Sequence, residues 1–282
     1  MNINQKAVEL SQGRIHYKEF GNEEAPAILF VHGFLANSLL WQDVAKGLSQ
    51  DFRCITPDWP LGSHSEPMKP DANVSPQGMI QIILEFIDHL NLNEVILVGN
   101  NSGGALAQMM VATHPERIEQ LILTSCDAYD IWLPREFKTS EIAAFIPGGL
   151  FVIANVIKFF PKARHQTGAY GWLSKRMPKE TSDSFALPLS CSPGIRRDCG
   201  KFLRAISPKL TLEAAKHFDK FNKPVLIAWS HEDRLFPIEH ANKLHQQFHN
   251  SKLVFIEDSY TFSGIDNPNQ LTNEIRIFLK GA

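Results

Sequence analysis

The segment from Val98 to Gly104, with the sequence VGNNSGG, places polar side chains in a glycine-rich turn between an apolar run and a helical pattern. Glycine at positions 99 and 103 allows the chain to turn tightly, and the turn centres on Asn101. An amide can polarise a substrate or a water molecule. It cannot act as a nucleophile near neutral pH, because its nitrogen lone pair is delocalised and its oxygen is neutral.

This strand–turn–helix segment resembles the nucleophile elbow, G-x-Nu-x-G, of the α/β-hydrolase superfamily, with Asn101 at the nucleophile position. The run VGNNSGGALAQ also resembles members with aspartate there, such as haloalkane dehalogenases and epoxide hydrolases, so that Asn101 is the amide counterpart of a nucleophilic carboxylate. Further upstream, His32-Gly33-Phe34 resembles the HG oxyanion segment. The resemblance implies an oxyanion hole made by the backbone N–H groups of Phe34 and Ser102.

Three further segments extend the resemblance along most of the chain. Residues 229–237, WSHEDRLFP, resemble the acid loop W-G-x-x-D-x-x-x-P, which implies that Asp233 is the acid. Residues 258–268, DSYTFSGIDNP, resemble the loop G-x-x-H-F-x-x-x-E-x-P, and the histidine position falls on Thr261. Residues 58–65 resemble the loop D-x-P-G-x-G-x-S, with Leu61 and Ser63 in place of two glycines.

A Ser-His-Asp type of reaction is therefore incompatible with Asn101 and Thr261. A threonine hydroxyl does not titrate near neutral pH and cannot replace histidine as a proton shuttle. The loss of one triad member removes most of the rate, roughly a million-fold in a worked serine protease. An oxyanion hole can still stabilise an anion without covalent catalysis.

Other side chains near the expected strand ends are candidates for the missing groups. His231 lies in the acid loop and could move protons, although a solvated loop histidine is the alternative interpretation; the same holds for His64. Asp127 follows a strand and is an alternative carboxylate, or else a helix N-cap. We expect Ser102 to donate its backbone N–H, and Cys126 to be a small buried apolar residue.

The elements that must position these residues are short apolar runs alternating with helical patterns. Continuous apolar runs are typical of strands buried on both faces of a parallel sheet, and their carboxyl ends carry the ligand site. We predict an α/β fold, a doubly wound and mostly parallel sheet of the α/β-hydrolase type with an inserted helical cap. The predicted strands are 27–31, 52–56, 95–98, 121–124, 225–229 and 253–256, and the predicted helices are 79–90, 104–113, 239–248 and 269–279.

The segment 127–222 interrupts this alternation with seven prolines, and we predict that it is the helical cap, inserted between core segments 1–126 and 223–282. Its apolar stretch 142–160 is broken by Pro147-Gly148-Gly149, which favours a cap helix beginning near Gly149 over a membrane span. We expect the pocket under the cap to be apolar. Candidates to line it are Phe145, Phe151, Ile153, Trp172 and Phe236, and two tryptophans, Trp41 and Trp59, are either pocket or packing residues.

Composition narrows the possible partners. The formal net charge of -2 selects neither nucleic acid nor an anionic membrane, and no metal or cofactor motif is present in the 282 residues. Four cysteines without a C-x-x-C pair and a polar N-terminus favour free thiols in a cytoplasmic protein, with a Cys191–Cys199 pair as the alternative. The expected partner is a small molecule, and the oligomeric state is left open.

Two functions are consistent with these residues. The first is a hydrolase or lyase of small, largely apolar esters, epoxides or haloalkanes, in which Asn101 polarises substrate or water and His231 or Asp233 moves protons. The second is a catalytically silent α/β-hydrolase relative that binds a small ligand under its cap. They differ in turnover and in whether a titratable nitrogen lies near Asn101.

Overall fold

A computed structural model describes residues 4–166 and 169–281. Its centre is an eight-stranded sheet in the order β1-β2-β4-β3-β5-β6-β7-β8. The pairings β1–β2 and β2–β4 are antiparallel, and all the others are parallel. The strands are β1 (Asn4–Leu10), β2 (Gly13–Phe20), β3 (Ala27–Val31), β4 (Arg53–Pro57), β5 (Val95–Asn101), β6 (Ile118–Cys126), β7 (Val225–Ser230) and β8 (Ser251–Ile256). The mostly parallel sheet is the predicted one.

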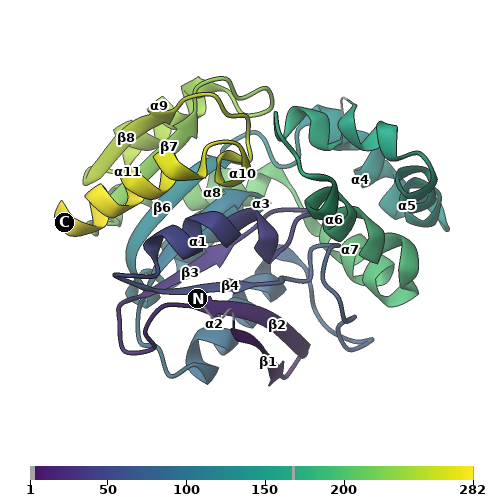
Figure 1. The fold of residues 1–282 in the computed structure, drawn as a ribbon, viewed down its shortest axis with the longest axis horizontal. Helices are drawn as coiled ribbons and strands as arrows, with labels where there is room; N and C mark the ends of the chain where they lie inside the picture. The colour runs from purple at the N-terminus through teal and green to yellow at the C-terminus, as the bar shows by residue number, and fades with distance from the viewer. Residues whose placement is uncertain (1–3, 167–168, 282) are drawn as a thin grey trace.

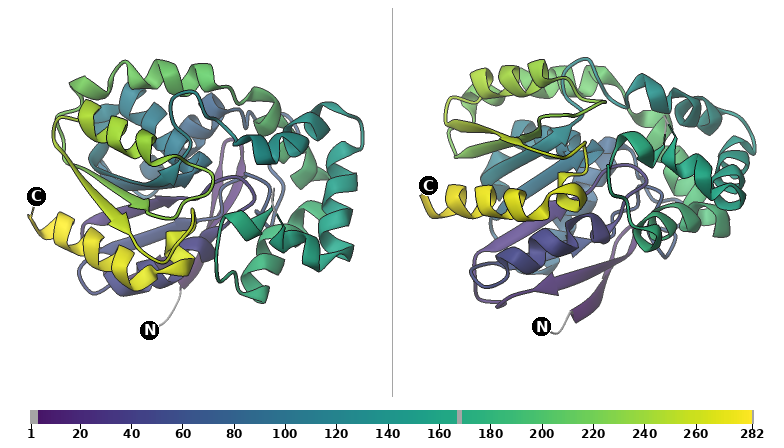
Figure 2. Two further views of the ribbon diagram at one scale, coloured as in Figure 1. Left: turned by 90° about the horizontal axis from the view of Figure 1, so that it is seen from above. Right: turned by 45° about the horizontal axis from the view of Figure 1, so that its top comes forward.

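Helices cover both faces of the sheet, as a doubly wound fold requires. On one face α1 packs against α11, and on the other α2 and α8 pack against α3, while α9 lies on β7 and β8 (Figure 2). These helices are α1 (Gln42–Leu48), α2 (Pro76–His89), α3 (Ser102–Thr113), α8 (Pro208–Ala215), α9 (Ile238–Gln247), the short α10 (Ser263–Asp266) and α11 (Pro268–Gly281).

Four helices form a separate group beside the sheet, on the right of Figure 1. They are α4 (Lys138–Phe145), α5 (Gly149–Phe159), α6 (Lys179–Cys191) and α7 (Pro193–Ala205). Helix α5 begins at the predicted residue, because Gly148 adopts the left-handed conformation (φ 77°) that separates it from α4. Within the described ranges, no helix is long and apolar enough to cross a membrane. Helix α8 was predicted to belong to the cap, and it packs instead against α3 of the core.

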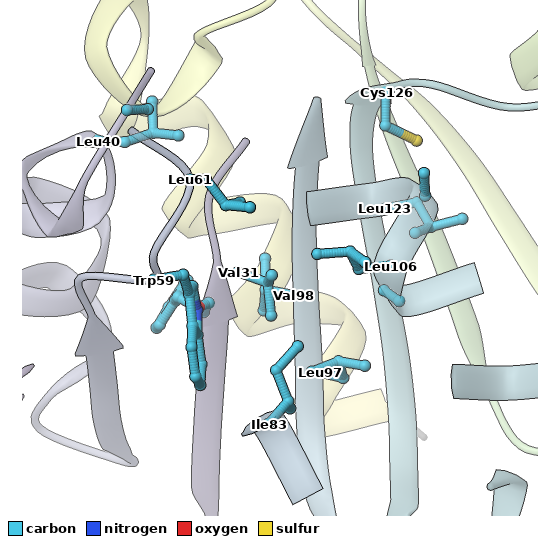
Figure 3. Packing of buried hydrophobic residues seen from close by; sticks show 14 of the residues in the cluster. Val31, Leu40, Trp59, Leu61, Ile83, Leu97, Val98, Leu106, Leu123 and Cys126 are labelled. Atoms are coloured by element: carbon cyan, nitrogen blue, oxygen red, sulfur yellow. The ribbon is translucent and has the colours of Figure 1, made fainter. Parts of the chain in front are cut away.

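The core lies between the central strands and the helices on either side. Every residue of β3 and β5 is buried, which explains the uninterrupted apolar runs at 27–31 and 95–98. Figure 3 shows Val31 of β3 beside Val98 of β5, with Leu106 of α3 against β5. Trp41 and Trp59 are 1% and 0% exposed, so both are packing residues. This packing holds the ends of β3, β5 and β6 together, where the candidate site lies.

Candidate functional site

The turn between β5 and α3 is held in a strained conformation by close backbone contacts. Asn101 has φ 53° and ψ -131°, a combination that L-residues with a side chain rarely adopt. A Cβ on Gly103 would collide with the carbonyl oxygen of Val31, and a Cβ on Gly33 would collide with the Asn101 side chain. The two glycines therefore allow the elbow to lie directly against the loop that follows β3.

The side-chain oxygen of Asn101 is not free to receive a ligand, because it already accepts a hydrogen bond from the neighbouring backbone. Its Oδ1 accepts a hydrogen bond of 2.8 Å from the Ser102 N–H, and the side chain is 5% exposed. That N–H is one of the two donors expected for the oxyanion hole. The other, the Phe34 N–H, has no hydrogen-bond partner in the part of the chain that the structure describes. One of the two expected donors is thus available for an incoming acceptor.

Asp233 and Thr261 lie together in the loops after β7 and β8. The Thr261 hydroxyl donates to Asp233 Oδ1 over 3.2 Å, and the same oxygen accepts the N–H groups of Leu235 and Phe236 at 2.8 Å each. Burial raises the pKa of Asp233 above its ordinary value, and these donors act against that shift. Asp233 Oδ2 is buried without a hydrogen-bond partner among the described residues.

Asn100 connects this pair to the elbow and was not singled out from the sequence. Its Nδ2 donates to the backbone oxygen of Thr261 at 2.8 Å, to Thr124 Oγ1 at 2.9 Å and to the backbone oxygen of Ser125 at 3.1 Å. Asn101, Asp233 and Thr261 therefore meet at one end of the sheet. The only sequence signal for Asn100 was its place inside the elbow motif.

Asp127 follows β6 and is completely buried beside the elbow. Its Oδ2 accepts from the Ser102 hydroxyl at 3.0 Å and its Oδ1 from the Leu133 N–H at 2.8 Å. Burial raises its pKa to about 7, although both hydrogen bonds favour the ionised form. Asp127 closes the loop to Leu133 and caps no helix, so the N-cap interpretation was wrong.

The histidines that could replace the missing base lie elsewhere. His231 is exposed at the surface, with Nδ1 3.1 Å from Glu257 Oε1. His64 is buried with Nε2 3.4 Å from Asp198 Oδ2 of α7, so it joins the core to the cap helices. His32 accepts the Trp59 N–H at Nε2, and burial lowers its pKa to about 4, which keeps it neutral. No histidine in the described ranges hydrogen-bonds to Asn101, Asp233 or Thr261.

An apolar cavity of about 450 Å³ lies between α5 and the loop after β3. Phe34 and Leu35 line its core side, and Ile153 and Ile157 of α5 are among the residues on its cap side. Asn101 does not line it, although Gly33, which contacts the Asn101 side chain, is next to Phe34 in the chain. One residue, Gly33, therefore lies between the cavity-lining Phe34 and the Asn101 side chain.

Of the five side chains predicted to line the pocket, only Ile153 lines this cavity. Phe145 and Phe151 line a separate groove on the outside of the cap helices, together with Arg196 and Arg197. Trp172 is half-buried beside the cavity-lining Leu173 without lining the cavity itself. Phe236 is 1% exposed and packs on Trp229 in the core. The cysteine pair considered from the sequence was also wrong, since all four cysteines are free.

Comparison with known proteins finds similarity to proteins of the α/β-hydrolase fold. The family described as alpha/beta hydrolase fold matches residues 26–148. An uncharacterized hydrolase of Bacillus subtilis, YugF, is 24% identical over 272 residues and 94% of each chain. Haloalkane dehalogenase 2 of Mycobacterium tuberculosis is 31% identical over 113 residues, 40% of this chain and 38% of that one. The crystal structure of haloalkane dehalogenase DbeA from Bradyrhizobium elkani superposes with a TM-score of 0.80 at 17% identity, covering 99% of this chain and 98% of that chain, which establishes the similarity of fold.

Proposed function

The chain belongs to the α/β-hydrolase superfamily, and we propose that it is a catalytically silent member that binds a small, largely apolar ligand under its cap helices. Of the two functions left open by the sequence, this one agrees better with the contacts at the elbow. Three features of the molecule support it: the residue at the position of the base, the residue at the nucleophile position and the cavity.

The observation that carries the proposal is the contact between Thr261 and Asp233. Asp233, at the acid position, accepts the Thr261 hydroxyl at Oδ1. Its Oδ2 is buried without a hydrogen-bond partner among the described residues. An imidazole at position 261 would supply an N–H donor to such an oxygen, whereas the threonine hydroxyl has a single proton and donates it to Oδ1. No other described histidine takes that place, because His231 binds Glu257 at the surface.

The nucleophile position supports the same conclusion. The Asn101 amide carries no reactive lone pair, and its Oδ1 accepts the Ser102 N–H that would otherwise stabilise a substrate oxyanion. Ser102 offers no replacement, because its hydroxyl is fully buried and donates to Asp127. Neither the Asn101 side-chain oxygen nor the Ser102 hydroxyl is therefore placed for covalent attack on a substrate.

The cavity suits a neutral ligand with one hydrogen-bond acceptor. Its walls are mainly apolar, and burying a charge there would be costly without a partner. The free Phe34 N–H lies in a residue that lines the cavity and can hold a carbonyl or hydroxyl oxygen. Esters, epoxides and long-chain alcohols or ketones have this chemistry.

Hydrolysis with Asp127 as general base is the second candidate, because a pKa of about 7 is suited to proton transfer near neutral pH. Two contacts oppose it. Both carboxyl oxygens are already bound, one to Ser102 and one to Leu133, and the group is 0% exposed. The Asp127→Asn variant separates the candidates, since it abolishes an Asp127-dependent activity and leaves simple binding intact.

The test combines turnover with binding. The unmodified protein is incubated with a 4-nitrophenyl ester, a styrene epoxide and a bromoalkane, and product is compared with a buffer blank. We expect no turnover.

Binding of 2-decanone is measured by calorimetry, and Ala163→Phe should abolish it because Ala163 lines the cavity. Ala25→Phe, in the loop before β3, is the matched control. Turnover that Asp127→Asn removes would replace the silent function with the second candidate, and binding that survives Ala163→Phe would place the ligand elsewhere.

A further inference from the structure

The cap helices expose an unusual amount of apolar surface. Eight of the ten large apolar side chains exposed in the described part of the chain lie between residues 142 and 160, on α4, α5 and the ends of those helices. Phe159 and Phe160 are 67% and 64% exposed, and Phe145 is 61% exposed. We call these exposed side chains between 142 and 160 the α4–α5 face. Exposed apolar patches of this kind mark interaction surfaces.

The charge around the α4–α5 face has one sign. From 142 to 179 the sequence contains six lysines and arginines and no aspartate or glutamate. Four of the six form ion pairs with acidic side chains outside this segment, so among the described residues the unpaired positive charge is that of Lys158 and Lys162. Lys158 and Lys162 are exposed, and Lys158 Nζ lies 5.5 Å from the Phe159 ring. Of the flanking acidic side chains, Glu141 pairs with Lys138 at 2.7 Å and Asp183 with Lys179 at 2.6 Å, while Glu180 at the start of α6 is exposed. The chain as a whole is slightly acidic, so this positive charge is local.

We propose that the α4–α5 face docks onto an anionic lipid surface. Aromatic and aliphatic side chains enter the interface between headgroups and acyl chains, while neighbouring lysines bind anionic headgroups. Figure 1 places α5 at the end of the molecule away from the C-terminus, where it can meet a flat surface without obstruction from the sheet. The views of Figure 2 agree with this position.

A second copy of the chain fits this surface less well. A twofold dimer would place the face against itself, so Lys158 and Lys162 would meet their own counterparts with no unpaired acidic side chain from 142 to 179 to balance them. Such a dimer would also cover Val152 and Val156, which are exposed and at the same time line the 450 Å³ cavity.

Docking would bring the cavity mouth to the lipid. Val152 and Val156 are 60% and 45% exposed, so the rim of the cavity belongs to the same apolar face. A ligand dissolved in the membrane would then reach Phe34 without crossing water. This last step rests on the proposed function, whereas the docking surface is independent of it.

The experiment is co-sedimentation of the full chain with vesicles of phosphatidylcholine alone or mixed with phosphatidylglycerol. We expect preferential binding to the anionic vesicles, weakened by salt. Phe159→Ser combined with Phe160→Ser should reduce binding on the order of a hundredfold. Ile277→Ser on α11, also an exposed apolar side chain, is the matched control and should have no effect.

Lys158→Gln combined with Lys162→Gln should reduce binding to anionic vesicles about tenfold, and Lys209→Gln with Lys220→Gln should not. The Ala163→Phe variant should still bind vesicles, because docking does not require an empty cavity; a failure of ligand binding is thereby distinguished from a failure of docking. The proposal is overturned if neither vesicle binds the protein, or if the Phe159 and Phe160 changes leave binding unaltered. A dimer in the absence of lipid that the same changes dissociate would assign the face to a second copy.

Discussion

Replacing Asp127 by asparagine should make the protein more stable at pH 8 and leave its stability nearly unchanged at pH 4. Asp127 has a pKa of about 7 in the folded protein, against an ordinary value of 3.8, because it is completely buried. Asparagine has the same shape, so its Oδ1 can accept the Leu133 N–H and its Nδ2 can donate to the Ser102 hydroxyl. The change therefore removes an ionisation and retains the contacts.

The sign of the effect follows from proton binding. Between pH 4 and pH 7 the unfolded chain has already released the Asp127 proton while the folded chain retains it, so rising pH favours unfolding. At 1.36 kcal/mol for each tenfold change in proton affinity, the shift amounts to about 4 kcal/mol of stability lost by pH 8. The Asp127→Asn variant does not lose this stability, because asparagine does not ionise. Other groups, such as neutral His32, contribute equally to both proteins and cancel in the difference.

The assay is urea unfolding of both proteins at several values from pH 4 to pH 8, followed by circular dichroism. The difference in unfolding free energy should grow by about 4 kcal/mol across this range. Ser102→Ala is the informative control. It removes a hydrogen bond that favours ionised Asp127, so it should raise the folded-state pKa further and extend the loss of stability to higher pH. Two parallel curves for the unmodified protein and Asp127→Asn would refute the buried-carboxyl argument.

Three further predictions concern the elbow. Asn101→Asp alone should form an alkyl-enzyme ester with a bromoalkane, seen as a burst that then stalls, and Thr261→His alone should do nothing; only the double variant should turn over steadily in a halide-release assay. A rate in the unmodified protein equal to that of the double variant would contradict this. Gly103→Ala should destabilise the fold by about 2 kcal/mol or more in urea unfolding, because the new Cβ meets backbone, whereas Gly148→Ala, whose Cβ would meet no atoms, should cost less despite its positive φ. A fluorophosphonate probe should leave Ser102 unlabelled in peptide mass spectrometry, since the hydroxyl is buried and has no histidine beside it; stoichiometric labelling would show that Ser102 is the nucleophile.

The parallel strands could be predicted from the sequence because their environment is uniform. Residues 27–31 are buried on both faces, so an unbroken apolar run indicated the strand without any knowledge of its neighbours. The N-terminal hairpin was missed for the opposite reason. In β2 buried residues such as Ile15 and Tyr17 alternate with Arg14, His16 and Lys18, and the apolar face is too sparse to stand out from a polar N-terminus.

The cap shows a different limit of sequence patterns. Helix α5 is apolar around most of its circumference, a pattern that usually indicates complete burial. The apolar sequence of this region led to the expectation that Phe145, at the end of α4, and Phe151, in α5, point into the pocket. Both side chains lie on the outer face of the cap helices instead. Periodicity identifies the burying face of a helix only where polar residues occupy the opposite face. The orientation of α5 depends on its packing against α6, which no local pattern contains.

The resemblance to a known family predicted which residues occupy the site. It did not predict their contacts, because these depend on three-dimensional packing. The motifs located Asn101, Asp233 and Thr261, but the occupation of the Ser102 N–H by the Asn101 side chain depends on a rotamer set by Gly33. The pKa of Asp127 likewise depends on burial by residues far away in the chain, so residue type alone could not place it near 7.

In the binding function that we propose, the strained elbow has no covalent chemistry to perform. A backbone conformation such as that of Asn101 costs on the order of 1–3 kcal/mol, and surrounding contacts must impose it. Here they are the Gly103 contact with the end of β3 and the Asn100 hydrogen bonds to the end of β6 and to the loop after β8. These same contacts fix the loop that carries Phe34, whose N–H is the free donor at the cavity. Under the proposed function, the elbow geometry would serve the binding of a ligand, because relaxing it would displace the loop that carries Phe34.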